Sequence, residues 1–414
     1  MHCSNISVSQ AGLGYAWRVI FLFGQYRKQA SDMHGSTRKG ELAMTREEYC
    51  SKIQEAIEAI GFRGEYLDHC RYGSGHINDT FLIRFKEPEG NVERYILQRM
   101  NHEIFKNPDE LMENICNVTS FLRDKISKMH GDTKRETMNV IYTKDGRPYF
   151  KDSIGACWRA YLFVGDTMSF DKVENTKDFY ESGVSFGRFQ NLLADFDAAS
   201  LHETIPNFHN TPVRYEAFLK AVKEDICGRA KEAEAEIRFL MQREKDMGIC
   251  MELQKAGELP LRVTHNDTKL NNILIDTKTG KGICVIDLDT VMPGLSIFDY
   301  GDSIRFGANR AAEDERDLTK VSLDLKLFEA YTKGFLEGCG GSLTEKEIEL
   351  LPMGAKLMTM ECGMRFLTDY LVGDTYFRIH REGHNLDRCR TQLKLVEDME
   401  QKWDSMKDIT GKYR

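Results

Sequence analysis

The pattern of apolar and polar residues predicts a mixed first part of the chain and a mainly helical remainder. After Met44, apolar residues recur at helical spacing, at Ile53, Ala56, Ile57 and Ile60. Thr45 and Glu48 form a capping-box pattern, in which each side chain satisfies the other residue's free backbone amide. A helix, and with it the start of ordered structure, is therefore expected near residue 45.

Between residues 62 and 165 the pattern is that of short strands around one helix. Runs rich in β-branched and aromatic residues predict strands at 80–85, 94–97, 139–142 and 158–163. A helical pattern occupies 108–127. Asp145-Gly146, between Ile141 and Tyr149, is typical of a hairpin turn. Together these segments predict a small α+β unit.

The chain beyond Asp178 is predicted to be mainly helical. One long helical segment is expected from apolar residues at Leu219, Val222, Ile226, Ala230, Ala233, Ile237 and Leu240. Gly165-Asp166, after an apolar run, is a plausible hinge. We therefore expect two domains, 44–164 and 165–414.

Composition narrows the class of protein. The 414 residues carry 57 Lys and Arg against 65 Asp and Glu, and the net charge of −8 argues against a nucleic-acid partner. Hydrophobic residues make up 41% of the chain, as in a soluble globular protein, and no apolar run approaches the roughly 20 residues that a bilayer helix needs. The 11 cysteines include no C-x-x-C pair, so neither disulfides nor a zinc site is predicted and a cytoplasmic location fits best.

Residues 1–43 differ from the rest because they are rich in Ser, Gly and Gln and lack periodicity. A targeting segment is one interpretation. We favour an unstructured extension or an upstream start, since a helix start follows Met44 at once.

The segment from His265 to Asn272 carries the clearest chemical signal, the spacing H-x-D-x-x-x-x-N. Kinase catalytic loops have this spacing, followed by a short apolar strand that ends in an acidic residue, here Asp287. Phosphoryl transfer needs one carboxylate to orient and deprotonate the attacking hydroxyl, and further oxygen ligands to hold magnesium against the phosphates. We assign the first role to Asp267 and the second to Asn272 and Asp287.

Several residues on or near this loop are assigned to supporting roles. His265 is grouped with the catalytic residues, and we expect it to brace the loop. Asp289, two residues after Asp287, is either a second metal ligand or a structural partner. Asp299-Tyr300-Gly301 is similar to the D-F-G motif of protein kinases but lacks a preceding β-branched run, so Asp299 and Asp302 are assigned to loop bracing.

A glycine-containing segment before the strand at 80–85 is a candidate nucleotide contact. Gly73, Ser74 and Gly75 would let backbone amides approach phosphate oxygens, and Asn78 follows them closely. An ordinary tight turn is the alternative. Position 78 breaks the G-x-G-x-x-G pattern and no Walker A sequence is present, which disfavours P-loop and Rossmann folds.

These residues resemble the aminoglycoside-phosphotransferase and choline-kinase family, through H-N-D-T-K-L-N-N at 265–272 and V-I-D-L-D-T-V-M-P-G at 285–294. The closer resemblance is to the N-acetylhexosamine 1-kinase subgroup. It is carried by Y-G-S-G-H-I-N-D, L-Q-R-M-N, I-P-N-F-H-N-T and R-F-L-T-D, which begin at residues 72, 97, 205 and 365. The family's fold is α+β, protein-kinase-like and bilobal, with a sheet-containing nucleotide-binding lobe and a larger, mainly helical lobe.

The resemblance implies an ATP- and magnesium-dependent kinase that phosphorylates the anomeric hydroxyl of N-acetylglucosamine or N-acetylgalactosamine. It also places sugar-binding residues in the larger lobe, at Arg365 and Tyr376, with His209 as a further candidate. Arginine can donate to several sugar oxygens at once, and tyrosine offers an aromatic face with a polar tip.

One departure from protein kinases concerns the lysine that grips the phosphates from the third strand. Here Gln98 and Arg99 occupy that register. Because successive residues of a strand point to opposite faces, only one of the two can face the nucleotide.

Other functions stay open at this point. A choline, homoserine or aminoglycoside kinase would have the same fold. A pseudokinase scaffold is disfavoured by the joint presence of Asp267, Asn272 and Asp287, and a metal hydrolase by the single histidine among carboxylates. We expect a monomer or weak homodimer.

Overall fold

The computed structural model describes residues 46–73 and 77–414. The chain divides into two units between Ile57 and Glu58, and every element from β1 onward lies in the second. The helix predicted after residue 45 is confirmed as α2 (Arg46–Ala59). Thr45, the first residue of the expected capping box, lies outside the described residues, as do residues 1–43.

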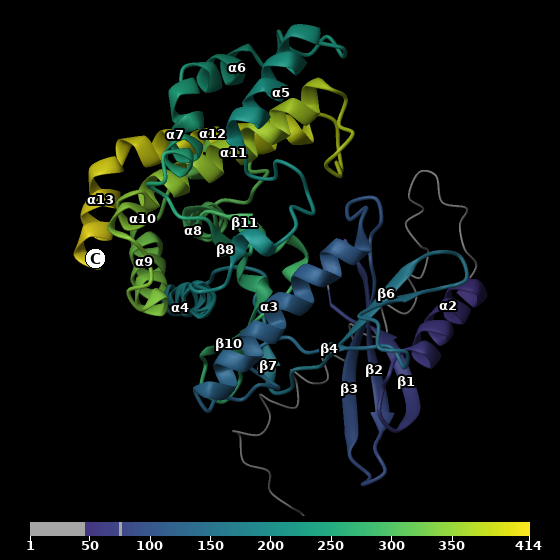
Figure 1. Cartoon of the computed structure of the whole chain (residues 1–414). Coiled ribbons are helices and arrows are strands. Elements are labelled where there is room, and N and C mark those ends of the chain that lie inside the picture. The colour runs from purple at the N-terminus through teal and green to yellow at the C-terminus, as the bar shows by residue number, and fades with distance from the viewer. Residues whose placement is uncertain (1–45, 74–76) are drawn as a thin grey trace, which may run out of the picture. The chain divides into compact units, whose positions relative to one another are not determined.

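The N-terminal region contains a six-stranded antiparallel sheet in the order β1-β2-β3-β6-β4, with β5 also paired to β6. Its strands are β1 (Glu65–Arg71), β2 (Asp79–Lys86), β3 (Val92–Arg99), β4 (Val140–Ile141), β5 (Phe150–Lys151) and β6 (Cys157–Leu162). Figure 1 shows β1, β2 and β3 side by side. All four predicted strands are confirmed, and alternation explains β2, where Phe81, Ile83 and Phe85 are buried on one face.

The turn at Asp145-Gly146 forms, with Gly146 at φ +83°, but it does not close a hairpin. The flanking strands β4 and β5 each pair with β6 instead of with each other. That part of the sequence prediction was wrong because a two-residue signal specifies the turn and not the partner of the strands beside it.

Helix α3 (Pro108–Lys128) confirms the helix predicted at 108–127. Asn107 caps its N-terminus by accepting a hydrogen bond from the Glu110 amide, and Pro108 occupies the first turn, where no amide hydrogen is needed. One face is buried, at Leu111, Ile115, Val118, Leu122 and Ile126. On that face Asn114 donates to the carbonyl of Val291, which connects α3 to the segment that follows Asp287.

The C-terminal region is mainly helical, as predicted, and with the N-terminal sheet it makes the fold α+β (Figure 1). Its helices are α4 (Thr176–Leu192), α5 (Thr211–Glu224), α6 (Glu234–Met241), α7 (Glu244–Lys255), α8 (Ser296–Gly307), α9 (Leu325–Cys339), α10 (Glu345–Glu349), α11 (Leu351–Leu371), α12 (His384–Gln401) and α13 (Trp403–Lys412). Helix α11 is buried around most of its circumference and forms the centre of the core.

Helices α4 and α9 approach each other closely because glycines face each other along their contact. The four positions are Gly183, Gly187, Gly334 and Gly338, and a Cβ at any of them would overlap the backbone of the opposite helix. This packing fixes α4, which carries Gln190 toward the candidate site.

The long helix predicted over 219–240 is wrong, because the chain breaks between α5 and α6. Asp225 has a left-handed backbone (φ 37°), and Gly228 has φ 67°. The Asp225 carboxylate accepts hydrogen bonds from the amides of Arg229 and Ala230, which stabilises a turn in place of continued helix. The apolar spacing persists across the break, so periodicity alone did not reveal it.

Five short strands connect these helices: β7 (Thr167–Met168), β8 (Arg262–Thr264), β9 (Ile273–Asp276), β10 (Gly282–Val285) and β11 (Met292–Gly294). They form two small antiparallel sheets, β10-β9-β7 and β11-β8. Asp166 at the predicted hinge has φ 55° and precedes β7, and the domain boundary at 164/165 stays a prediction. In the described ranges, no helix combines the length and apolarity needed to cross a bilayer.

Candidate active site

The loop between β8 and β9 is held in place by α8. The Asp299 carboxylate accepts hydrogen bonds from the backbone amides of His265 (2.9 Å) and Asn266 (2.8 Å), while Asp302 accepts one from the amide of Thr268 (3.2 Å). Asn266 has a left-handed backbone (φ 63°), and these bonds fix that conformation. The prediction that Asp299 and Asp302 brace the loop is confirmed.

His265 lies beneath the loop with no exposed surface. Its Nε2 lies 2.9 Å from the carbonyl of Ile286, and its Nδ1 accepts from the amide of Asp267 (3.3 Å). The ring packs edge-on against Phe186 and Phe189. The expected bracing role is therefore confirmed, and His265 joins the loop to the residue before Asp287.

Asp267 and Asn272 lie together. The Asn272 amide nitrogen donates to the backbone oxygen of Asp267 (2.8 Å) and to its carboxylate (3.1 Å). The nitrogen is thus turned to Asp267, and the amide oxygen remains as an acceptor. The Asp267 side chain keeps 27% of its surface exposed, so an incoming hydroxyl can reach it.

Lys269 is a member of this group that the sequence analysis missed. Its Nζ lies 2.7 Å from the other carboxylate oxygen of Asp267. Burial would lower the pKa of Lys269, but the charges of Asp267 and Asp302 raise it above its usual value. Its place two residues after Asp267 was the available signal, since a cation there stays near the carboxylate.

Asp287 lies two residues after β10 in a left-handed conformation (φ 62°). Burial, together with the charges of Asp289 and Asp267, raises the pKa of Asp287 to about 7. The carboxyl groups of Asp267, Asp287 and Asp289 therefore lie close enough to repel one another, and the nearby cations Arg159 and Lys269 offset this repulsion only in part. The charges of Asp267 and Asp289 thus act on the Asp287 carboxyl group, and the joint role of Asp267 and Asp287 stays a prediction.

This donor set fits a hard divalent cation. Asn272 and Asp287 offer an amide oxygen and a carboxylate, ligands that magnesium accepts together with water and phosphate oxygens. Within 46–73 and 77–414, no group of three His, Cys, Asp or Glu side chains is arranged to hold a metal. A cation here would therefore depend on ligands from the nucleotide.

Asp289 is buried and bound on two sides. It pairs with Arg159 of β6 (2.5 Å) and accepts a hydrogen bond from the amide of Asn78 (2.7 Å). The Asn78 oxygen in turn accepts from the amide of Asn101 (3.0 Å). Of the glycine-containing segment, Gly73 has φ +78°, and Ser74 and Gly75 lie outside the described residues.

Gln98 and Arg99 point to opposite faces of β3. Gln98 lies opposite Arg159 in β6 and accepts hydrogen bonds from its guanidinium group. Arg99 lies beside Asp79, with 3.8 Å between the guanidinium and the carboxylate. The structure thus brings Gln98 to the group around Asp289 and does not bring Arg99 there. Arg159 is a second residue that sequence reasoning missed.

A cavity of about 280 Å³ opens beside the loop. Asn266 lines it next to Asp267, and Phe208 and His209 line it from the segment before α5. His209 Nδ1 lies 2.8 Å from Glu361 of α11, which also accepts a hydrogen bond from Thr211. His209 is thereby fixed at the wall of the cavity.

Arg365 and Tyr376 lie together next to Phe208. The Arg365 guanidinium carbon is 5.4 Å from the Phe208 ring centre and 5.8 Å from that of Tyr376. It forms no hydrogen bond or ion pair with any residue that the structure describes. Burial and the nearby charge of Arg365 lower the pKa of Arg214, whose guanidinium donates to the Phe208 carbonyl. The guanidinium groups of Arg365 and Arg214 therefore both lie next to Phe208, which lines the cavity.

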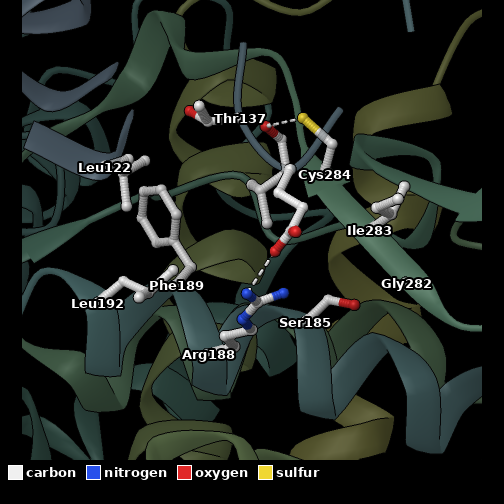
Figure 2. Close-up of a pocket in the computed structure, with 11 residues that line it drawn as sticks. Leu122, Thr137, Ser185, Arg188, Phe189, Leu192, Gly282, Ile283 and Cys284 are labelled. Atoms are coloured by element: carbon white, nitrogen blue, oxygen red, sulfur yellow. Dashed lines mark hydrogen bonds and ion pairs between the residues drawn. The ribbon is translucent and has the colours of Figure 1, made fainter. Parts of the chain in front are cut away.

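A second cavity, between α3, α4 and β10, has room for about one water molecule. Figure 2 shows Leu122, Phe189 and Leu192 on one side of it and Arg188 near its rim, where it pairs with Glu136. Its size excludes a substrate.

Comparison with protein families places this geometry in a known class. Residues 68–324 match the model of the phosphotransferase enzyme family called APH. The chain belongs to this phosphotransferase family. The match includes the loop at 265–272, Asp287 and the N-terminal strands.

Solved structures agree with the kinase-like fold of this phosphotransferase. A microcompartment-associated aminopropanol kinase is 14% identical, with a TM-score of 0.55 over 86% of this chain and 98% of its own. An aminoglycoside phosphotransferase from Alicyclobacillus acidocaldarius is 11% identical, with a TM-score of 0.57 over 91% and 99%. An amicoumacin kinase in complex with AMP-PNP, Ca²⁺ and Ami is 12% identical, with a TM-score of 0.51 over 84% and 96%. The predicted family and fold are confirmed.

Proposed function

We propose that this phosphotransferase transfers the terminal phosphoryl group of ATP to the C1 hydroxyl of an N-acetylhexosamine, giving the sugar 1-phosphate and ADP. The observation that carries the proposal is the grouping of Asp267, Asn272 and Asp287 beside a cavity of about 280 Å³. The sugar itself comes from the resemblance of the motifs at 72–79, 205–211 and 365–369 to N-acetylhexosamine 1-kinases.

Asp267 is the residue that orients the acceptor hydroxyl and takes its proton. Its carboxylate is partly exposed, and hydrogen bonds from Asn272 and the charge of Lys269 fix its orientation. The anomeric hydroxyl is more acidic than an ordinary alcohol, so a carboxylate of modest basicity suffices. Lys269 also places a positive charge where negative charge develops on the transferred group.

Asn272 and Asp287 would hold magnesium, and Asp289 is a further candidate ligand. When bound, the ion would neutralise charge on the nucleotide's phosphates. The uncompensated carboxyl group of Asp287 supports this assignment. The amicoumacin kinase with a similar fold holds AMP-PNP and Ca²⁺, which supports a nucleotide and a divalent cation here as well.

The cations near the cavity favour a neutral acceptor over an amine. Arg365 and Arg214 flank Phe208, and a further positive charge brought near these two guanidinium groups would be repelled by them. This argues against polycationic aminoglycosides and against amino alcohols such as the aminopropanol used by the similar kinase. A sugar with an acetamido carbonyl could accept hydrogen bonds from Arg365 and stack on Tyr376.

The test is ADP release from purified protein with ATP and magnesium across a panel of acceptors. The panel contains N-acetylglucosamine, N-acetylgalactosamine, 1-amino-2-propanol, choline and an aminoglycoside. The 1-deoxy analogue of the active sugar is the matched control, because it lacks only the proposed nucleophile. Turnover with an N-acetylhexosamine and none with its 1-deoxy analogue is expected, with a sugar 1-phosphate in the phosphorus NMR spectrum.

Other results would replace the proposal. A sugar 6-phosphate as product would agree with kinase activity but would refute C1 as the phosphorylated position. Turnover with an amine and with no sugar would refute an N-acetylhexosamine as the acceptor. ATP binding without turnover on any acceptor would favour a scaffold role.

A further inference from the structure

A row of polar side chains crosses the sheet where protein kinases have their phosphate-binding lysine. Thr80, Gln98 and Arg159 lie opposite one another on β2, β3 and β6. Gln98 donates to the Thr80 hydroxyl (3.1 Å) and accepts from Arg159 Nε (3.1 Å) and Nη2 (2.9 Å). Both ends of the Gln98 amide are therefore engaged, and the only cation of the row is Arg159.

Arg159 is almost completely buried. Only 1% of its side chain is exposed, and taking a cation out of water is unfavourable unless its charge and its N–H groups are satisfied. Asp289 supplies one charge partner, at 2.5 Å from Nη2. Nη1 is also buried but has no hydrogen-bond partner among the described residues. One edge of the guanidinium group is thus fixed, and one nitrogen is left over.

The unpaired nitrogen belongs to a group that lies within the candidate active site. Asp289 joins Arg159 to Asn78, which ends the glycine-containing segment, and stands two residues after Asp287. The charge of Arg159 also acts on Asp287 directly. Arg159, which belongs to the sheet, is therefore connected through Asp289 to Asn78, and its charge acts on the candidate metal ligand Asp287.

We propose that Arg159 supplies the positive charge that a lysine on the third strand supplies in protein kinases, with its Nη1 binding a non-transferred phosphate of the nucleotide. This rests on the proposed kinase function but not on the identity of the acceptor. Gln98 and Asp289 hold the remaining nitrogens and are positioning residues in this role. A planar guanidinium group suits it, because it can bind two fixed partners along one side and still donate to a phosphate oxygen from the other.

The test compares ligands that differ only in their phosphates. Binding of Mg-ADP, Mg-ATP and adenosine is measured by calorimetry, with competition for the weaker ligand. Arg159→Met alone leaves Asp289 buried and unpaired, so the main variant is Arg159→Met with Asp289→Asn, which removes both charges. Asp289→Asn alone distinguishes the effect of losing the Asp289 charge from the effect of losing Arg159. Arg243→Met with Glu400→Gln is the control, because it neutralises another partly buried arginine–carboxylate pair whose residues are remote in sequence from the site.

The double variant is expected to raise the dissociation constants of ADP and ATP by about 10- to 100-fold, the usual effect of losing a charged hydrogen bond, and to leave that of adenosine unchanged. Asp289→Asn alone keeps the charge of Arg159 and should lose less of the preference for ADP over adenosine than the double variant does. The control pair should keep this preference. Adding Gln98→Lys to the double variant should restore part of this preference, because it returns a cation to the same row.

Four results would overturn the proposal. They are equal weakening of adenosine and ADP, unchanged ADP binding, an equal loss in Asp289→Asn alone, and no recovery with Gln98→Lys. If wild-type protein binds Mg-ADP but phosphorylates no N-acetylhexosamine, the proposed acceptor is wrong, and the proposed role of Arg159 is unaffected. Wild-type protein that binds no nucleotide would overturn both.

Discussion

Asn78 and Asp289 are 211 positions apart in the sequence, and the amide of Asn78 donates a 2.7 Å hydrogen bond to the Asp289 carboxylate. Both residues are more than nine-tenths buried. The bond fastens the segment before β2 to the segment after Asp287. Asn78, one residue before β2, and Asp289, two residues after Asp287, are therefore held together.

Removing this bond should weaken both the fold and nucleotide binding. Asn78→Ala leaves a buried carboxylate short of a donor, which should lower the free energy of unfolding by about 1–3 kcal/mol and raise the KM for ATP more than the KM for the acceptor. Asn78→Asp should be worse at pH 7, because two carboxylates would then face each other. Urea unfolding and steady-state kinetics measure both effects, and an Asn78→Asp protein as stable as wild type would contradict the contact.

Asp267→Asn tests the assignment of the base. The substitution keeps the shape of the side chain and the contact with Asn272 but removes the proton acceptor, so kcat should fall by about 10²- to 10⁴-fold. The dissociation constant of ATP should change little. Asp404→Asn, at an exposed position of α13, is the matched control and should have normal kcat. Turnover of Asp267→Asn close to that of wild type would exclude Asp267 as the base.

The core of the candidate site could be predicted from the sequence because it depends on local spacing. Asp267 and Asn272 lie on one loop, and Asp287 lies two residues after the strand that pairs with the strand leaving that loop. Four intervening residues and one hairpin therefore bring them together whatever the rest of the chain does. The bracing role of Asp299 was assigned for a different reason, because no β-branched run precedes it as one precedes Asp287.

The parts that could not be predicted depend on pairing between distant segments. Arg159 reaches the site because β6 pairs with β3, and nothing in the β6 sequence identifies that partner. Strand β1 was not predicted because Glu65–Arg71 has few apolar residues and no fully buried position. The break after Glu224 was missed because apolar residues recur at helical spacing in the sequence on both sides of Asp225, although the structure leaves Ile226 exposed.

Glu347 provides a pH-dependent contribution to stability outside the site. Burial acts to raise its pKa, but hydrogen bonds from Arg262 and Ser296 hold the pKa below the ordinary 4.5. A lowered carboxyl pKa means that the unfolded chain takes up the proton first as the pH falls, so the stabilisation is complete above pH 4.5 and decreases below it. Wild type should therefore exceed Glu347→Gln in melting temperature at pH 7, and the difference should narrow in more acidic buffer.

Glu349→Gln is the control for this experiment, because its side chain is 60% exposed. Its melting temperature should equal that of wild type at every pH. A difference between wild type and Glu347→Gln that stays constant from pH 7 to pH 3 would show that the carboxylate charge of Glu347 does not stabilise the fold.

The glycine contact between α4 and α9 predicts a large difference between two similar substitutions. In Gly187→Ala the new Cβ would overlap the backbone oxygen of Phe335, so the helices must move apart, at a cost of about 1–3 kcal/mol or more. Gly411→Ala in α13 meets no atom within 4 Å and should be neutral or stabilising by up to about 1 kcal/mol, since alanine favours helix. Thermal unfolding of the two variants measures this, and equal melting temperatures would contradict the close packing.

Arg365 should affect the acceptor and not the nucleotide. It has no ion-pair partner among the described residues, and its guanidinium carbon lies 5.4 Å from the ring centre of Phe208 and 5.8 Å from that of Tyr376, so Arg365→Met removes a free donor while keeping much of the packing. We expect the KM for the N-acetylhexosamine to rise by about 10-fold, as for a lost charged hydrogen bond, with an unchanged KM for ATP. Arg238→Met, at an exposed site on α6, is the control. If Arg365→Met instead raised the KM for ATP alone, or gained turnover with amines and kept its affinity for the sugar, the residue would lie outside the sugar site.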